Sequence, residues 1–151
     1  MIGIRRAAPE DVAGAAQVYL RSRRASVPAV PPLVHDDDDD VRRWFAEEVF
    51  SRRQLWVAHD DVDGIVGVMV LDGDWLDQLY VAPSHTGRGV GTRLLEVARS
   101  ERPAGLQLWA FASNLGARRF YERHGFVAVE ETDGTGNEEK SPDVRYLWRP
   151  T

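Results

Sequence analysis

The sequence of 151 residues contains no cysteine, so a disulfide framework, a thiolate metal site and a cysteine nucleophile are all excluded. It also has no apolar run long enough to span a bilayer, and its first residues, MIGIRRAAPED, lead into no apolar secretory signal. We therefore expect a cytoplasmic protein without a membrane partner.

An excess of positive charge is missing too, because the formal net charge at pH 7 is −5. A general nucleic-acid-binding surface needs the opposite balance, so we expect no nucleic-acid partner. We expect no bound metal either, because His59, His85 and His124 are not accompanied by other metal-ligating residues. These histidines are interpreted as surface or cap residues. What is present is an ordinary globular composition, 43% hydrophobic and 28% charged, whose length suits one domain over residues 1–151.

The most informative segment is a glycine-rich stretch between a strand and a helix. Residues 75–81 are aromatic and β-branched and end before Pro83, as expected of a strand. From Val90 onward, apolar residues recur at helical spacing up to Ala98. The glycines between them place several backbone N–H groups at the positive end of the helix dipole. This arrangement predicts a loop that binds phosphate.

Two common phosphate loops fit this segment poorly. A nucleoside triphosphate loop ends in a lysine and a Ser/Thr, but Arg93 follows Thr92 here and no lysine is near. A dinucleotide fingerprint needs a third glycine where Thr92 stands, and it belongs to the first strand of its domain. Taken alone, a glycine-rich turn is also explained by a flexible connection between a strand and a helix.

The segment resembles the acyl-CoA pyrophosphate loop of the GNAT superfamily of N-acetyltransferases, whose pattern is Gln/Arg-x-x-Gly-x-Gly/Ala. Thr86 departs from the usual Gln/Arg, which puts one side-chain contact in doubt but leaves the amide groups in place. The resemblance implies that the co-substrate is acetyl-CoA. We predict that Arg88 adds charge near its phosphates, with its side chain directed outward from the loop, and a solvent-facing arginine without a partner is the alternative. The residues it assigns to the pyrophosphate are Thr86, Gly87, Arg88, Gly89, Val90, Gly91 and Thr92.

A second block, residues 106–126, strengthens the resemblance. An apolar strand leads to Asn114, a good helix N-cap, and the helix after it ends near Gly125. Helical spacing places Asn114, Ala117, Arg118 and Tyr121 on one face. In GNAT proteins this face looks onto the cofactor, with the Asn position on the CoA arm and the Tyr position near the thioester sulfur. On spacing alone, Tyr121 is equally well explained as a half-buried core residue beside Phe120.

The remaining elements follow from hydrophobic periodicity and from turn residues. The expected order is β-α-α-β-β-β-α-β-α-β-β, an α/β fold with a GNAT-like, mixed, mostly antiparallel central sheet flanked by helices. The acidic run 36–40 is interpreted as the N-cap and first turn of the second helix, with a recruiting patch for a cationic amine as the alternative. Residues 132–143 are polar and contain glycine, so we expect a loop there.

The resemblance also implies how the reaction would proceed. Backbone groups of Leu79, Tyr80 and Val81 would bind the pantetheine arm and the thioester carbonyl, and Tyr121 would protonate the leaving thiolate. The first candidate for the general base is Asp77, which could equally be the salt-bridge partner of an arginine. Glu130, Glu131 and His35 are reserve candidates.

In GNAT architecture the acceptor enters opposite the CoA. The regions that would line its pocket are residues 27–35, 75–78 and 132–143, with Trp75, Asp77, His35 and Glu131 as candidate contacts. The acceptor would be a small-molecule or peptide amine, attacked directly in a ternary complex, and the protein a monomer or homodimer. The leading function is thus an acetyl-CoA-dependent N-acetyltransferase. A non-catalytic acyl-CoA-binding module is the alternative, and a phosphate-binding fold of another kind comes third.

Overall fold

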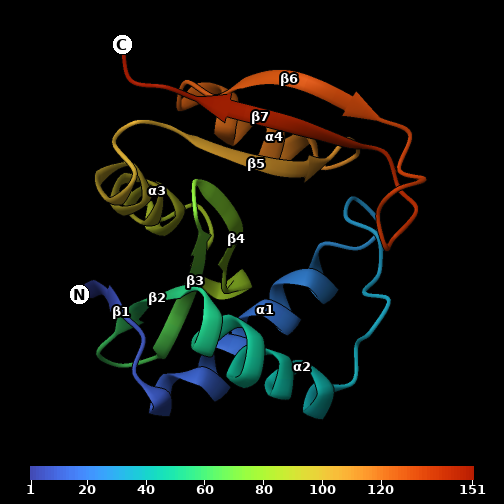
Figure 1. Ribbon diagram of the computed structural model, residues 1–151. Helices are drawn as coiled ribbons and strands as arrows, with labels where there is room; N and C mark the ends of the chain where they lie inside the picture. The colour runs from blue at the N-terminus through green and yellow to red at the C-terminus, as the bar shows by residue number, and fades with distance from the viewer.

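A seven-stranded sheet in the order β1-β2-β3-β4-β5-β7-β6 runs through the computed structural model, which describes residues 1–151 (Figure 1). Every neighbouring pair is antiparallel except β4 and β5. The expected α/β fold class and element order are confirmed. The strands are β1 (Ile2–Arg6), β2 (Gln54–Asp60), β3 (Gly64–Asp72), β4 (Trp75–Val81), β5 (Leu106–Phe111), β6 (Val127–Thr132) and β7 (Asp143–Trp148).

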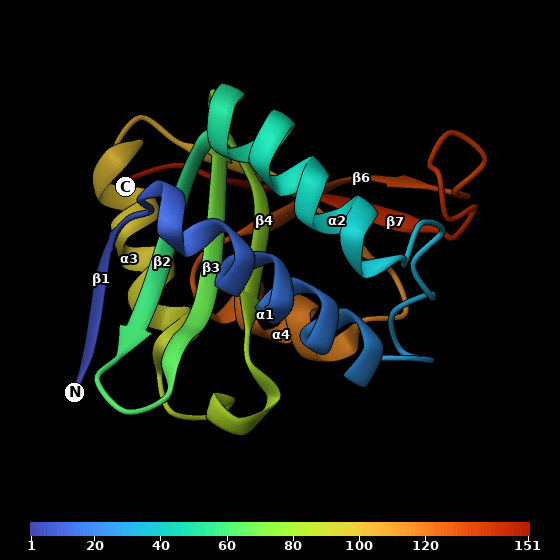
Figure 2. The same cartoon turned by 90° about the horizontal axis from the view of Figure 1, so that it is seen from below.

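Helices cover both faces of the first half of the sheet. Figure 2 shows α1 (Val12–Ala25) and α2 (Asp38–Trp44) crossing one face of β2–β4, while α3 (Val90–Glu101) lies on the other. The central strand β3 is therefore apolar on both faces, with Val68–Leu71 fully buried. The second half carries α4 (Leu115–Arg123) beside β5 (Figure 1). None of the helices is both long and apolar enough to cross a bilayer.

The acidic run 36–40 begins α2, as the N-cap interpretation predicts. The side chain of Asp37 accepts hydrogen bonds from the backbone N–H groups of Asp39 and Asp40, at 3.0 and 3.1 Å. Three aspartates then occupy the first turn, where the helix dipole favours negative charge. The helix continues as a π-helical turn, Phe45–Phe50 (η2), which leads to β2.

A close contact positions α3 against the sheet. A Cβ atom added to Gly67 of β3 would lie 3.0 Å from both Ala58 Cβ and Leu94 Cδ1, and 3.1 Å from Val90 Cγ1. Only glycine therefore lets the first two turns of α3 pack this closely on β3. The N-terminus of α3 is held directly over the sheet as a result.

The strands β4 and β5 separate almost as soon as they meet. Their ladder consists of a single pair, Trp75 with Gln107, although both strands continue beyond it. Figure 1 shows β4 running away from the layer formed by β5, β7 and β6. The far half of β4 consequently has a sheet neighbour on one side only.

Candidate active site

The glycine-rich loop follows a short 3₁₀ turn, Pro83–His85 (η3), at the end of β4. Gly87 and Gly89 have φ values of +74° and +81°, in the left-handed region that glycine adopts without strain. The first hydrogen bond at the start of α3 is donated by Arg93 to the carbonyl of Gly89, at 3.1 Å. The N–H groups of Val90, Gly91 and Thr92 thus have no helical partner, which is the arrangement that binds anions.

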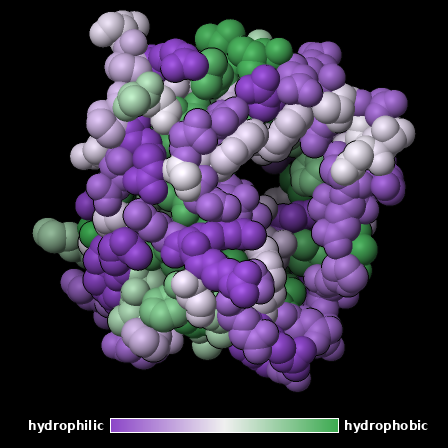
Figure 3. Space-filling view, in the orientation of Figure 1, coloured by the Kyte–Doolittle hydropathy of each residue, from purple (hydrophilic) through white to green (hydrophobic).

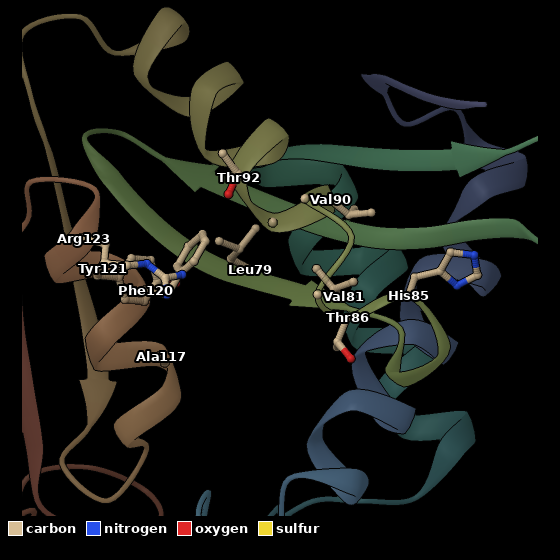
Figure 4. A pocket seen from close by; sticks show the side chains of 13 residues that line it. Leu79, Val81, His85, Thr86, Val90, Thr92, Ala117, Phe120, Tyr121 and Arg123 are labelled. Atoms are coloured by element: carbon tan, nitrogen blue, oxygen red, sulfur yellow. The ribbon is translucent and has the colours of Figure 1, made fainter.

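This loop forms one wall of a cavity of about 400 Å³ (Figure 4). The other walls come from β4 and from α4, which faces the loop across the opening. The structure brings together most of the residues expected to bind the cofactor. Those that line the cavity are Leu79, Val81, Thr86, Gly87, Gly89, Val90, Gly91, Thr92, Ala117 and Tyr121.

Alternation along β4 decides which backbone groups face the open side. Ala82 donates its N–H to the carbonyl of Val66 on β3, at 2.8 Å. Because successive residues of a strand direct their backbone groups to opposite sides, those of Leu79 and Val81 point toward the gap left by β5. The backbone of Tyr80, which was also expected to contact the cofactor, points to β3 instead, and its ring packs edge-on against Tyr19 at 5.1 Å.

Tyr121 lies where the cofactor cavity meets a second, smaller crevice of about 110 Å³ between β4 and β5. Leu79 and Ala117 also line both spaces, and Asn114 lines the crevice. Asn114 is the N-cap of α4, as expected, because its side chain accepts the N–H of Ala117 at 3.1 Å. This cap fixes the start of the helix that presents Tyr121.

Burial raises the pKa of Tyr121 well above that of an ordinary phenol. Its side chain is also packed edge-on against Phe120 and Phe126, with ring centroids 5.3 and 5.5 Å away. The phenol therefore stays protonated at neutral pH and can donate a hydrogen bond into the crevice. An ordinary phenol has a pKa of about 10 and a thiol about 8.5, so complete proton transfer to a free thiolate is unfavourable, and burial increases that difference.

Three arginines lie differently from what the sequence suggests. Arg118, expected on the cofactor face, donates from Nε to the Tyr146 hydroxyl at 3.0 Å and from a terminal nitrogen to the Ala112 carbonyl at 3.2 Å. Arg88 is exposed and lies outside the cavity lining. Arg123 lines the cavity together with Phe120, and sequence reasoning missed both. Ala117, Phe120 and Arg123 follow one another at intervals of three residues, and this helical spacing was the available signal.

Asp77 is half-exposed and forms an ion pair with Arg53, 2.7 Å from guanidinium nitrogen to Oδ2. The salt-bridge alternative thus describes its contact in the structure. The same side chain lines the crevice that contains Tyr121, so it also lies where a base would be useful. Burial raises its pKa, and the positive charge of Arg53 opposes that effect.

A further cavity of about 550 Å³ opens on the other side of β4, between α1, α2 and the loop 132–143. Figure 3 shows the molecule hollowed on this face, with mostly hydrophilic residues around the opening. His35 lines the cavity and pairs with Glu138 at 2.8 Å. Glu139 and Asp40 add negative charge, although Asp40 pairs with Arg43 at 3.1 Å and Arg23 also lines the cavity. Gln78 lines both this cavity and the crevice of Tyr121, so the two spaces adjoin.

Three of the four expected acceptor contacts do not line this larger cavity, and of these Asp77 lines the crevice of Tyr121 instead. Trp75 lies at the start of β4, at its one pair with β5. Glu131 is exposed on β6. Two of the carboxylates that line the cavity, Glu138 and Glu139, come from the 132–143 loop, which the expected contacts included only as a segment, and the third, Asp40, comes from α2.

The expectation for the histidines is wrong at one position. His85 is buried, with 4% of its surface exposed, and it has two carboxylate neighbours, Asp60 and Asp63. His124 is the C-cap of α4, as expected, and its Nδ1 lies 2.7 Å from the Phe120 carbonyl.

Comparison with known proteins agrees with this geometry. Residues 51–128 match the family described as "Acetyltransferase (GNAT) domain". The peptidyl-lysine N-acetyltransferase YjaB of Salmonella typhimurium is 34% identical over 90% of this chain and 92% of its own. The solution structure of apo-form YjaB from Escherichia coli superposes with a TM-score of 0.79 at 28% identity, covering 98% of this chain and 97% of that one.

A more distant structure, the PaiA N-acetyltransferase of Thermoplasma acidophilum in complex with coenzyme A, shares the fold with a TM-score of 0.73. It has 18% identity and covers 99% of each chain. The family match spans half of this chain, and the Salmonella relative is similar over nearly its whole length. The chain therefore belongs to the GNAT superfamily and is an acetyl-CoA-dependent acyltransferase.

Proposed function

We propose that this protein transfers the acetyl group of acetyl-CoA to the side-chain amine of a lysine in a peptide or protein, by direct attack in a ternary complex. The observation that carries the proposal is the position of Tyr121, which lines both the cofactor cavity and the crevice toward the acceptor side. The lysine acceptor is suggested by the YjaB relatives, which are named peptidyl-lysine N-acetyltransferases, and by the acidic residues around the outer cavity.

In this proposal the cofactor's pyrophosphate accepts hydrogen bonds from the free amides at the start of α3. Its pantetheine arm pairs with the open edge of β4, where the backbone groups of Leu79 and Val81 lack a neighbouring strand. Bringing thioester and amine together in this way supplies several kcal/mol of the barrier reduction. The residues fit the cofactor because the glycine loop, the edge of β4 and Arg123 of α4 offer donors on three walls of one cavity.

Tyr121 is proposed to donate a hydrogen bond to the sulfur as negative charge develops on it. The raised pKa of the buried phenol keeps that donor present at neutral pH. The amine is mostly an ammonium at pH 7 and must lose a proton before it attacks. Asp77 is the proposed acceptor of that proton, through water in the crevice it lines with Tyr121.

The cofactor site is tested by Gly91→Val. Gly91 is the second residue of α3, and a Cβ there would meet the Phe120 ring at 3.5 Å, an ordinary contact, so the fold should tolerate the change. Its isopropyl group would occupy the cofactor cavity, and we expect calorimetric titration to show CoA affinity at least about tenfold weaker. Gly116→Val is the matched control, because Gly116 is the second residue of α4 and is exposed. Equal CoA affinity in the two folded variants would remove the loop from the cofactor site.

Tyr121→Phe removes only the hydroxyl proposed to assist the leaving sulfur. We expect kcat to fall by about a hundredfold, the low end for a general acid, because the pKa order opposes complete proton transfer. CoA affinity should stay nearly unchanged. In the control Tyr146→Phe, a hydroxyl bonded to Arg118 and Glu122 is lost, which should lower stability by about 1 kcal/mol and leave kcat intact. Wild-type kcat in Tyr121→Phe would exclude the tyrosine from the chemistry.

The base is tested by the pH profile of Asp77→Asn. If Asp77 accepts the ammonium proton, kcat/KM should fall at least about tenfold near pH 7 and recover as rising pH deprotonates the amine in solution. Asp72→Asn is the control, because Asp72 also lies near Arg53, at 3.6 Å, but outside the crevice. Matching pH profiles for the two variants would mean that Asp77 only holds Arg53.

The acceptor is tested by measuring the rate of CoA release with two peptides. One contains lysine, and the other has arginine in place of that lysine. We expect only the lysine peptide to be acetylated. In Glu138→Gln/Glu139→Gln its KM should rise a few-fold, with a smaller effect at high salt, because exposed charges are weak and screened. Glu131→Gln removes a carboxylate outside the cavity and should change nothing. A KM effect at Glu131 alone would place the peptide along β6 instead.

A further inference from the structure

Three side chains with metal-ligand chemistry converge on the far side of the loop that precedes α3. Asp60 ends β2, Asp63 lies in the β2–β3 turn, and His85 belongs to η3. One ligand atom from each lies within 4.8 Å of the other two. His85 Nε2 is 3.1 Å from Asp63 Oδ2 and 3.9 Å from Asp60 Oδ2.

The imidazole nitrogen at the centre of this group lacks a hydrogen bond. His85 is 4% exposed, and its Nε2 is buried with no hydrogen-bond partner, because the contact with Asp63 has the distance but not the direction of one. A buried polar atom without a partner is costly. A nitrogen lone pair facing two carboxylates is repelled by them, so Nε2 needs either its own proton or a cation between it and the carboxylates.

The surroundings already hold the three ligand atoms in place. His85 Nδ1 lies 2.8 Å from Ser84 Oγ, so it can donate there while Nε2 keeps its lone pair for a metal. Asp60 uses Oδ1 to accept the backbone N–H groups of Val62 and Asp63, at 2.7 and 3.2 Å. Its other oxygen, Oδ2, is left facing His85.

We propose that Asp60, Asp63 and His85 form a binding site for a late first-row divalent metal ion, with Zn²⁺ as its probe. Zinc binds imidazole nitrogen and carboxylate oxygen at about 2.0–2.2 Å in tetrahedral geometry, which separates neighbouring ligand atoms by about 3.3–3.6 Å. The two distances at His85, 3.1 and 3.9 Å, bracket that range. The imidazole favours zinc, cobalt or nickel over magnesium and calcium, which prefer oxygen ligands. Water would complete the coordination on the open side, at Asp63.

A metal here would join the β2–β3 turn to the segment that leads into the glycine-rich loop. His85 also lines the cofactor cavity from behind, next to Thr86. None of the three ligands has a part in the proposed acetyl transfer. The site is therefore a structural clamp near the cofactor loop, independent of the assignment of Tyr121 and Asp77.

The test is calorimetric titration of chelator-treated protein with Zn²⁺, together with the visible spectrum of the Co²⁺ form. We expect one site of micromolar affinity or tighter, and a rise in melting temperature with zinc. In Asp63→Asn, which alters an exposed side chain and should fold, the affinity should fall at least about tenfold and the melting shift should disappear. The control is Asp61→Asn, the same charge change in the same turn but outside the cluster, which should bind as the wild type does.

Three results would overturn the site. The first is the absence of binding by the wild type at a Zn²⁺ concentration of about 100 µM. The second is an equal loss in Asp61→Asn and Asp63→Asn, which would mean diffuse attraction to an acidic turn. The third is loss of binding in His35→Ala, which would place the ion at the His35–Glu138 pair instead.

Discussion

The site depends on the early separation of β4 from β5. Antiparallel neighbours hold the rest of the sheet together, whereas this one parallel pair is limited to Trp75 and Gln107. Past that pair, the backbone groups of Leu79 and Val81 have no neighbouring strand, and unpaired backbone groups require another partner. The gap therefore supplies a hydrogen-bonding edge for an extended ligand, and α4 places Tyr121 across it. Two binding spaces result, one on each side of the same strand.

The charges of these two spaces are opposite in sign, which suits a reaction between an anionic cofactor and a cationic amine. On one side the start of α3 offers free N–H groups and the positive end of its dipole, and Arg123 adds a guanidinium. On the other side Asp40, Glu138 and Glu139 bring three carboxylates against the two guanidinium groups of Arg23 and Arg43, which leaves a small negative excess. Close packing holds the start of α3 in position, because Gly67 lets α3 rest directly on β3. The burial of Tyr121 between the cofactor cavity and the small crevice keeps its phenol neutral.

Membership of the GNAT superfamily leaves the non-catalytic binding module without support. It also makes the departures from the family pattern easier to interpret. Thr86 replaces the usual long side chain of the loop and bonds the Pro83 carbonyl at 3.2 Å, so its hydroxyl serves the turn itself. Just before it, His85 is buried beside Asp60 and Asp63, and the loop is connected to the β2–β3 turn through these side chains.

The sequence by itself determined the features that depend on neighbours in the chain. Periodicity predicted the strands and helices, and glycine spacing predicted the loop. Asn114 and the acidic run 36–40 were recognisable as helix starts because a cap bonds N–H groups two or three residues away. Only the tertiary structure decided which distant residues meet. Arg53 pairs with Asp77 across 24 positions, and Arg118 turns to Tyr146 across 28. His35 meets Glu138, and His85 meets two aspartates from a separate turn, because the sheet order and helix packing bring those segments together. A long polar side chain can take any of several partners, and local spacing carries no information about which of them the folded chain places within reach.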